Sequence, residues 1–158
     1  METIRQLERE DDLADLISLS RAFFVEYEAH HDEFFDIVGL EEEHITGYFE
    51  RTLGSDSDAT FVAVVNQHMV GYITVHVRPQ AAFYKIKEVG AISGLMVQRE
   101  HRRAGIGRRL LAQARAFFKE QGVRYFTVYT ALANESAISF YEADGLLPLQ
   151  TTLVGVIG

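Results

Sequence analysis

The chain has 158 residues and a formal net charge of −8, with 47% hydrophobic and 24% charged residues. This length suits one domain with a sizeable core, and the composition is that of an ordinary soluble globular protein. The sequence has no cysteine, its apolar runs are too short to cross a bilayer, and its first residues lack the apolar core of a signal peptide. These features exclude disulfides, thiolate metal sites and cysteine nucleophiles, and they favour a cytoplasmic protein that does not bind a membrane.

The charges are unevenly distributed along the chain. Residues 1–60 contain 4 basic and 17 acidic side chains, whereas residues 61–158 contain 11 basic and 6 acidic ones. The first segment should favour cations and the second should attract an anion, although the acidic residues could equally serve solubility alone. Because the basic residues cluster around one turn and form no long stripe, no nucleic-acid partner is expected.

The first half of the chain predicts a strand, two helices and a hairpin. The first helix, capped by Asp11 or Asp12, has apolar positions at helical spacing from Leu13 to Tyr27. Two β-rich runs are separated by Gln67-His68, which predicts a hairpin, and Pro79 ends the second run. The other expected elements are a strand over residues 3–7, a helix over 41–53, and hairpin strands over 60–66 and 69–78.

The second half predicts strands that alternate with helices. Gly90 and Gly94 are candidate bulge sites within the strand expected over residues 88–97. The remaining elements are a helix over 105–121, a strand over 124–131, a helix from Asn134 to Ala143, and a final strand or strand pair over 146–156. The expected fold is therefore an α/β mixed sheet in a single domain over residues 1–158.

The stretch from Gly94 to Leu111 predicts an anion-binding turn. It begins as an apolar strand, passes through an arginine-rich turn and becomes an amphipathic helix. Unpaired N–H groups at the start of a helix attract anions, and glycine at positions 105 and 107 would let a bulky anion approach the main chain. The turn therefore predicts a pyrophosphate site, and the alternative is a helix N-terminus with a solvated basic face.

Two common phosphate-binding patterns do not fit this turn. The dinucleotide fingerprint requires a third glycine where Leu110 stands, and the nucleoside-triphosphate loop requires Lys and Ser or Thr where arginines follow Gly107. The glycine spacing alone therefore leaves the pyrophosphate compound unidentified.

A second motif makes the pattern more specific. Asn134 to Leu146 has the form N-x-x-A-x-x-F-Y-x-x-x-G-[FL], some thirty residues after R-x-x-G-x-G at Arg102, Gly105 and Gly107. In this order the two motifs resemble the GNAT superfamily of acyl-CoA-dependent N-acyltransferases. The resemblance implies a central mixed sheet of six to seven strands with splayed central strands, flanked by about four helices.

The resemblance also implies a binding mode for acetyl-CoA. The turn would hold the pyrophosphate through main-chain amides, and the strand before it would pair with the pantetheine arm. A main-chain N–H near Met96 or Val97 would stabilise the oxyanion of the tetrahedral intermediate. Asn134 would contact the pantetheine arm. The implied cofactor-binding residues are Leu95, Met96, Val97, Arg102, Arg103, Ala104, Gly105, Ile106, Gly107, Arg108, Asn134, Ala137 and Tyr141.

Tyr141 is the expected catalytic acid under this resemblance. A thiol leaving group has a pKa of about 8.5 and a phenol about 10, so a positioned tyrosine can hydrogen-bond to the sulfur and give it a proton. The structural alternative is an aromatic residue on the buried face of a short helix next to Phe140.

The sequence departs from the family pattern at the expected base. Many relatives carry a carboxylate where this chain has Ser93 and Gly94. Glu88 lies earlier on the same strand and, without a bulge, shares a face with Gly94 and Met96. It is a candidate base, although it could equally be a solvated charge at the strand end. Glu26, Glu28, His30 and His31 lie on the segment that usually covers the acceptor site, and Glu26, Glu28 and His30 are candidate substrate-binding residues.

No metal is expected, because adjacent histidines on a helix diverge and no HExxH motif occurs. The expected function is an N-acetyltransferase that transfers an acetyl group from acetyl-CoA to a small amine or peptide amine by direct attack in a ternary complex. The alternative is an acyl-CoA-binding regulatory module with little transferase activity. The resemblance leaves open whether the chain forms a homodimer, as many relatives do.

Overall fold

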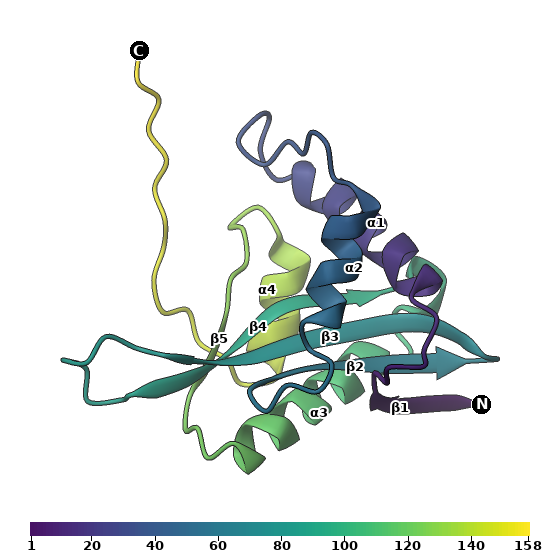
Figure 1. Cartoon of the computed structure of the whole chain (residues 1–158). Helices are drawn as coiled ribbons and strands as arrows, with labels where there is room; N and C mark the ends of the chain where they lie inside the picture. The colour runs from purple at the N-terminus through teal and green to yellow at the C-terminus, as the bar shows by residue number, and fades with distance from the viewer.

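One mixed sheet lies at the centre of the molecule, with helices on both of its faces (Figure 1). The structure is a computed structural model that describes residues 1–158. In chain order the elements are β1 Glu2–Gln6, α1 Ala14–Glu28, α2 Glu42–Glu50, β2 Asp58–Val65, β3 His68–Pro79, β4 Glu88–Val97, the 3-10 turn η1 Arg99–His101, α3 Ile106–Glu120, β5 Phe126–Val128 and α4 Glu135–Ala143.

The strands follow one another across the sheet in sequence order, from β1 to β5. The first four strands are antiparallel to their neighbours, whereas β5 is parallel to β4. Helix α3 makes the crossover that a parallel pair requires. The arginine turn therefore lies between the end of β4 and the start of α3, as the sequence predicts.

The β2–β3 hairpin turns through Asn66 and Gln67, which have φ angles of 50° and 68°. Two successive residues with positive φ are typical of the type I′ turn, whose twist matches that of the flanking strands. The predicted turn at Gln67-His68 is therefore one residue too late, because His68 already belongs to β3.

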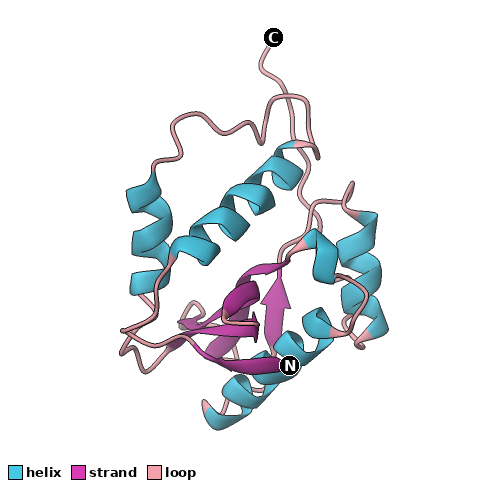
Figure 2. Cartoon of the chain, turned by 90° about the vertical axis from the view of Figure 1, so that its right-hand side faces the viewer, coloured by secondary structure: helices cyan, strands magenta, loops and turns pink.

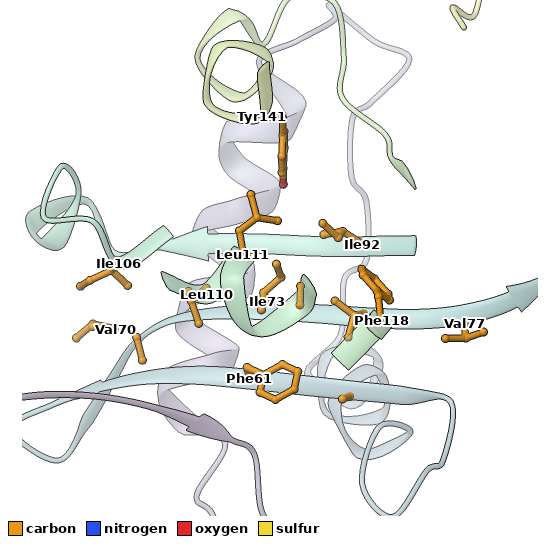
Figure 3. Packing of buried hydrophobic residues seen from close by; sticks show 14 residues of the cluster. Phe61, Val70, Ile73, Val77, Ile92, Ile106, Leu110, Leu111, Phe118 and Tyr141 are labelled. Atoms are coloured by element: carbon orange, nitrogen blue, oxygen red, sulfur yellow. The ribbon is translucent and has the colours of Figure 1, made fainter. Parts of the chain in front are cut away.

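Two apolar cores lie on opposite faces of the sheet. On one face, Leu110 and Leu111 of α3 and Tyr141 of α4 pack against the sheet (Figure 3). On the other face, Leu16 of α1 and Phe49 of α2 pack against it. Figure 2 shows the helices on either side of the strands. The acidic N-terminal helices and the arginine-led helix α3 consequently cover different faces.

The predicted six to seven strands are too many, because the sheet has five. Residues 146–158 contain no strand, although a strand or strand pair was expected there, and their backbone runs away from the sheet (Figure 1). Strand residues gain stability only from a hydrogen-bonded neighbour, and this segment has none. The strand expected over 124–131 is likewise reduced to the three residues of β5. None of the helices is both long and apolar enough to cross a membrane.

Candidate active site

The turn between β4 and α3 presents a row of free main-chain N–H groups. Gly105 caps α3 with a φ of 84° and contributes no side-chain hydrogen bond, and Arg103 also has a positive φ of 65°. The first N–H of this region with an acceptor in the chain is that of Arg109, which donates to the carbonyl of Gly105. The six N–H groups from residue 103 to 108 have no such acceptor. Free N–H groups in this arrangement are suited to bind an anion, and the pyrophosphate site expected from the sequence stays a prediction.

The arginines of the turn divide into two groups. Arg102 is directed back toward the protein, where its Nε donates to the carbonyl of Val97 at 2.8 Å and its Nη2 to Glu26 at 2.8 Å. Arg109 pairs with Glu2 and donates to the carbonyl of Ala104. Arg103 and Arg108 are exposed and make no ion pair. They are therefore the two guanidinium groups of the turn that are free for an anion.

The two glycines of the turn, Gly105 and Gly107, are required for different structural reasons. The left-handed backbone of Gly105 disfavours any residue with a Cβ. A Cβ on Gly107 would lie 3.3 Å from the ring of Phe140. Both glycines are expected to admit an anion, but Gly107 also allows α3 and α4 to pack closely.

Strand β4 has a free edge next to this turn. Its pairing with β5 covers only Gly90, Ala91 and Ile92, whereas its pairing with β3 continues to Val97. The second half of β4, residues 93–97, therefore has a strand neighbour on one side only. Leu95, Met96 and Val97, the residues predicted to pair with a pantetheine arm, lie on this half, where an extended ligand could add as a strand.

Helix α4 carries the tyrosine predicted to act on the leaving group. Asn134 caps the helix as expected, with its Oδ1 accepting from the N–H of Ala137 at 3.1 Å. Tyr141 is 7% exposed, and its hydroxyl points from α4 toward β4 near Ile92 (Figure 3). Burial raises the pKa of this phenol, so it stays protonated. Its hydroxyl has no hydrogen-bond partner within the chain, which suits a group that donates to a bound ligand.

A bulge in β4 changes which residues share a face of the strand with Glu88. Thr74 of β3 lies opposite Gly94 and Val75 lies opposite Ile92, so Ser93 is the extra residue. Before the bulge, Glu88 alternates with Gly90 and Ile92, which face α3. After it, Gly94 and Met96 face α1 and α2. The expectation that Glu88 shares a face with Gly94 required a regular strand and does not apply to this one.

Ser93 takes part in a polar cluster that the sequence analysis missed. Its Oγ lies 2.6 Å from Nε2 of His76 and also hydrogen-bonds to the hydroxyl of Tyr48. Nδ1 of His76 lies 2.8 Å from Oδ1 of Asp58. These side chains come from β2, β3, β4 and α2, so only the strand register and the bulge bring them together. A sequence signal for the bulge was present in the two glycines of β4.

The residues expected to bind the acceptor, on the segment from Glu26 to His31, contact other parts of this chain. Glu26 pairs with Arg102 at 2.8 Å and with Arg99 at 3.5 Å. The ring of His30 lies edge-on to Tyr27, and Nδ1 of His31 accepts two main-chain N–H groups. Neither Glu28 nor His30 hydrogen-bonds to Ser93 or Tyr141. No group of three or more His, Asp or Glu side chains is arranged to hold a metal ion.

A cleft of about 700 Å³ lies between α1, the β2–β3 turn and the arginine turn. Glu26, Met96 and Arg102 line it, but Ser93 and Tyr141 do not. This cleft therefore reaches the free half of β4 at Met96 but does not include the tyrosine or the serine cluster.

Residues 13–146 match the acetyltransferase (GNAT) family. The chain belongs to this family. It is 28% identical to an uncharacterized N-acetyltransferase of Methanocaldococcus jannaschii over 143 residues, which cover 90% of this chain and 59% of that protein. It is 27% identical to an uncharacterized N-acetyltransferase of Archaeoglobus fulgidus over 136 residues, which cover 86% of this chain and 87% of the relative.

The chain thus spans about three fifths of the first relative's length and most of the second. Among solved GNAT structures it is similar to the aminoglycoside N-acetyltransferase AAC(6')-Iy in complex with CoA, with a TM-score of 0.80 and 17% identity over 99% of this chain and 95% of that one. The same enzyme has also been solved with a bisubstrate analog, CoA-S-monomethyl-acetylneamine. At this identity the similarity shows the GNAT fold alone.

Proposed function

We propose that this GNAT protein transfers an acetyl group from acetyl-CoA to a primary amine by direct attack in a ternary complex. The observation that carries the proposal is the row of six acceptor-free N–H groups at residues 103–108, directly beside the free edge of β4. A ligand with a diphosphate at one end and a peptide-like arm would match both features. The bound CoA of AAC(6')-Iy, which has a similar fold, also supports the proposal.

The residues of this chain fit such a donor. The main-chain amides of the turn would bind the diphosphate, with Arg103 and Arg108 adding charge. The free edge of β4 at Leu95–Val97 would hydrogen-bond to the pantetheine amides. Val97 has a further constraint, because its carbonyl already accepts from Arg102.

Bound acetyl-CoA would supply an activated acetyl group as a thioester. A main-chain N–H near Met96 or Val97 would donate to the carbonyl oxygen as negative charge develops there. Tyr141, kept neutral by burial, would hydrogen-bond to the departing sulfur. The tyrosine would approach from the α4 face of β4, which leaves the α1 and α2 face for the acceptor.

The proposed acceptor is an amine that is cationic in solution. The segment over residues 1–60, with its 17 acidic side chains, includes α1 and α2, and this charge favours cations near the face that they cover. A polyamine, an amino sugar, a lysine side chain and a peptide N-terminus share this chemistry. The bisubstrate analog bound to AAC(6')-Iy joins CoA to an amino sugar, so neamine belongs in the first test panel.

The test is acetyl-CoA-dependent thiol release over a panel of amines and peptides, with products identified by their gain in mass. Thiol release that requires an amine, together with an acetylated amine product, is the expected result. Tight acetyl-CoA binding without acceptor-dependent thiol release across the panel would instead favour a regulatory module that binds acyl-CoA.

A further inference from the structure

Three neighbouring strands align Asp58, His76 and Ser93 on the face of the sheet that α2 covers. Asp58 of β2 lies directly opposite His76 of β3, and their side chains are 2.8 Å apart. The other ring nitrogen of His76 lies 2.6 Å from Oγ of Ser93. The order carboxylate, imidazole and hydroxyl matches that of the hydrolase triads, here built on a different fold.

The hydrogen bonds of Asp58 determine which atoms donate and which accept between Asp58, His76 and Ser93. Its Oδ1 also accepts from Arg78 at 2.9 Å, and its Oδ2 accepts from Ser55 at 3.1 Å. Burial alone would raise the pKa of Asp58, but the bonds from His76, Arg78 and Ser55 and the charge of Arg78 lower it. The ionised carboxylate can only accept, so Nδ1 of His76 donates to it, and in the neutral imidazole Nε2 remains as an acceptor.

The hydrogen bond between Ser93 and His76 runs in the same direction, toward Asp58. Because Nε2 accepts, the hydroxyl of Ser93 donates its only proton to His76. The hydroxyl of Tyr48, which burial keeps protonated by raising its pKa, therefore donates to Ser93, and one lone pair of the Ser93 oxygen stays available. A nitrogen that approaches Ser93 therefore meets an oxygen whose proton already points toward an imidazole.

Of Asp58, His76 and Ser93, only Ser93 is exposed to solvent. The side chains of His76 and Asp58 are 14% and 19% exposed, whereas Ser93 is exposed. Ser93 is also the bulge residue at which β4 loses its β5 neighbour. Ile92, directly before it, belongs to the buried cluster on the opposite face that also contains Tyr141, whose hydroxyl points toward β4 (Figure 3). The serine and the tyrosine thus approach β4 from its two faces.

We propose that Ser93, backed by His76 and Asp58, takes the proton from the acceptor ammonium before attack, an inference that rests on the proposed function. The ammonium N–H gives its proton to Oγ of Ser93 as the Ser93 hydroxyl proton passes to Nε2 of His76. No bond to carbon forms at Ser93, and the resulting imidazolium faces the carboxylate of Asp58. Ser93 is the group that touches the substrate, and His76 and Asp58 act through it.

The remaining protons also balance. The neutral amine attacks the thioester carbon and the carbon–sulfur bond breaks. The nitrogen then releases a second proton, which offsets the one gained by the departing thiolate beside Tyr141. The first proton leaves His76 for solvent, so one proton is released for each amide formed.

The first experiment tests the cluster without relying on activity. Imidazole nitrogen NMR of the whole protein, assigned with His76→Gln, should show neutral His76 protonated at Nδ1. This signal should change in both Asp58→Asn and Ser93→Ala. Protonation at Nε2, or a signal that neither variant alters, would overturn the proposed direction of transfer.

The second experiment compares two amines of similar size and different basicity. Ethylamine is almost fully protonated at pH 7, whereas trifluoroethylamine is largely neutral and needs no base before attack. We expect Ser93→Ala and His76→Gln to lower kcat/KM for ethylamine by about 10²-fold or more, the range for lost general base catalysis. The loss for trifluoroethylamine should be less than about threefold, because its proton is already absent.

His68→Gln is the matched control, since His68 lies on the same strand beside a carboxylate, Asp15 at 3.4 Å, without a serine. It should change neither rate. Equal losses for both amines in Ser93→Ala would mean a structural role and would overturn the relay, as would an acetyl group found on Ser93 itself. Wild-type protein that binds acetyl-CoA and acetylates neither amine nor any panel acceptor would contradict the proposed function, and the NMR result would still decide the hydrogen-bond direction.

Discussion

Arg102 donates to the carboxylate of Glu26 at 2.8 Å and so joins the end of β4 to α1. The same guanidinium donates to the carbonyl of Val97. Glu26 therefore has a structural partner at the turn, and part of the positive charge of that turn is neutralised. The sequence predicts that Arg102 binds acetyl-CoA and that Glu26 binds the acceptor amine. The ion pair indicates that each of these side chains mainly holds the other in place.

We expect Glu26→Gln to leave the KM for the acceptor within about twofold of wild type and to change stability by less than about 1 kcal/mol, because the ion pair is partly exposed. Acceptor titration at saturating acetyl-CoA and thermal unfolding measure both effects. A large rise in the acceptor KM would restore Glu26 as an acceptor contact.

The two unpaired arginines should carry the charge-dependent part of donor binding. Arg103→Gln and Arg108→Gln should each weaken CoA binding by about three- to tenfold at low salt, and the difference should shrink at high salt through screening. Calorimetric titration with CoA at two salt concentrations measures this. Arg124→Gln, far along the chain from the turn, is the charge-matched control and should bind CoA as wild type does.

Gly105 should be needed for the shape of the turn. Its φ of 84° costs a residue with a Cβ about 1–2 kcal/mol, so Gly105→Ala should lower stability and also weaken CoA binding. Gly122→Ala is the matched control, because Gly122 has a φ of 75° and open space around its Cβ position. It should lose similar stability with unchanged CoA affinity. Equal CoA binding in the two variants would argue against the turn as the diphosphate site.

Tyr141→Phe should separate catalysis from stability. The hydroxyl makes no hydrogen bond within the chain, so its removal should leave the melting temperature nearly unchanged. Turnover should fall at least about tenfold through loss of the bond to the leaving sulfur, with acetyl-CoA affinity unchanged. Steady-state kinetics at saturating donor provide the measurement, and near wild-type turnover would remove Tyr141 from the mechanism.

Asp11 should make stability depend on acid pH. Hydrogen bonds from Arg5 lower the pKa of Asp11 in the folded protein, so the ionised form stabilises the fold above the unfolded pKa of about 3.9. This contribution should disappear as pH falls through the lower folded pKa. Asp11→Asn should therefore be less stable than wild type at pH 7 in urea, and the two proteins should converge in strong acid. A constant difference across this range would contradict the assigned ion pair.

The local features of this chain could be predicted from sequence because neighbouring residues determine them. The bounds of β4, the cap of α4 by Asn134 and the start of α3 after the arginine turn all follow from short-range patterns. The polar cluster could not be predicted, because Asp58 and Ser93 meet only through strand register and a one-residue bulge. The prediction of a C-terminal strand was wrong for a related reason. The strand propensity of a segment does not say whether an edge of the sheet will pair with that segment.

The bulge at Ser93 has a consequence for how specificity can change. The sheet separates two compartments, one under α1 and α2 and the other under α3 and α4, and the bulge decides which residues of β4 face each of them. The groups proposed to hold the donor belong to the second compartment and its adjoining turn. Under the proposed function, we therefore expect substitutions in the N-terminal helices to change which nucleophile is admitted while leaving donor recognition intact.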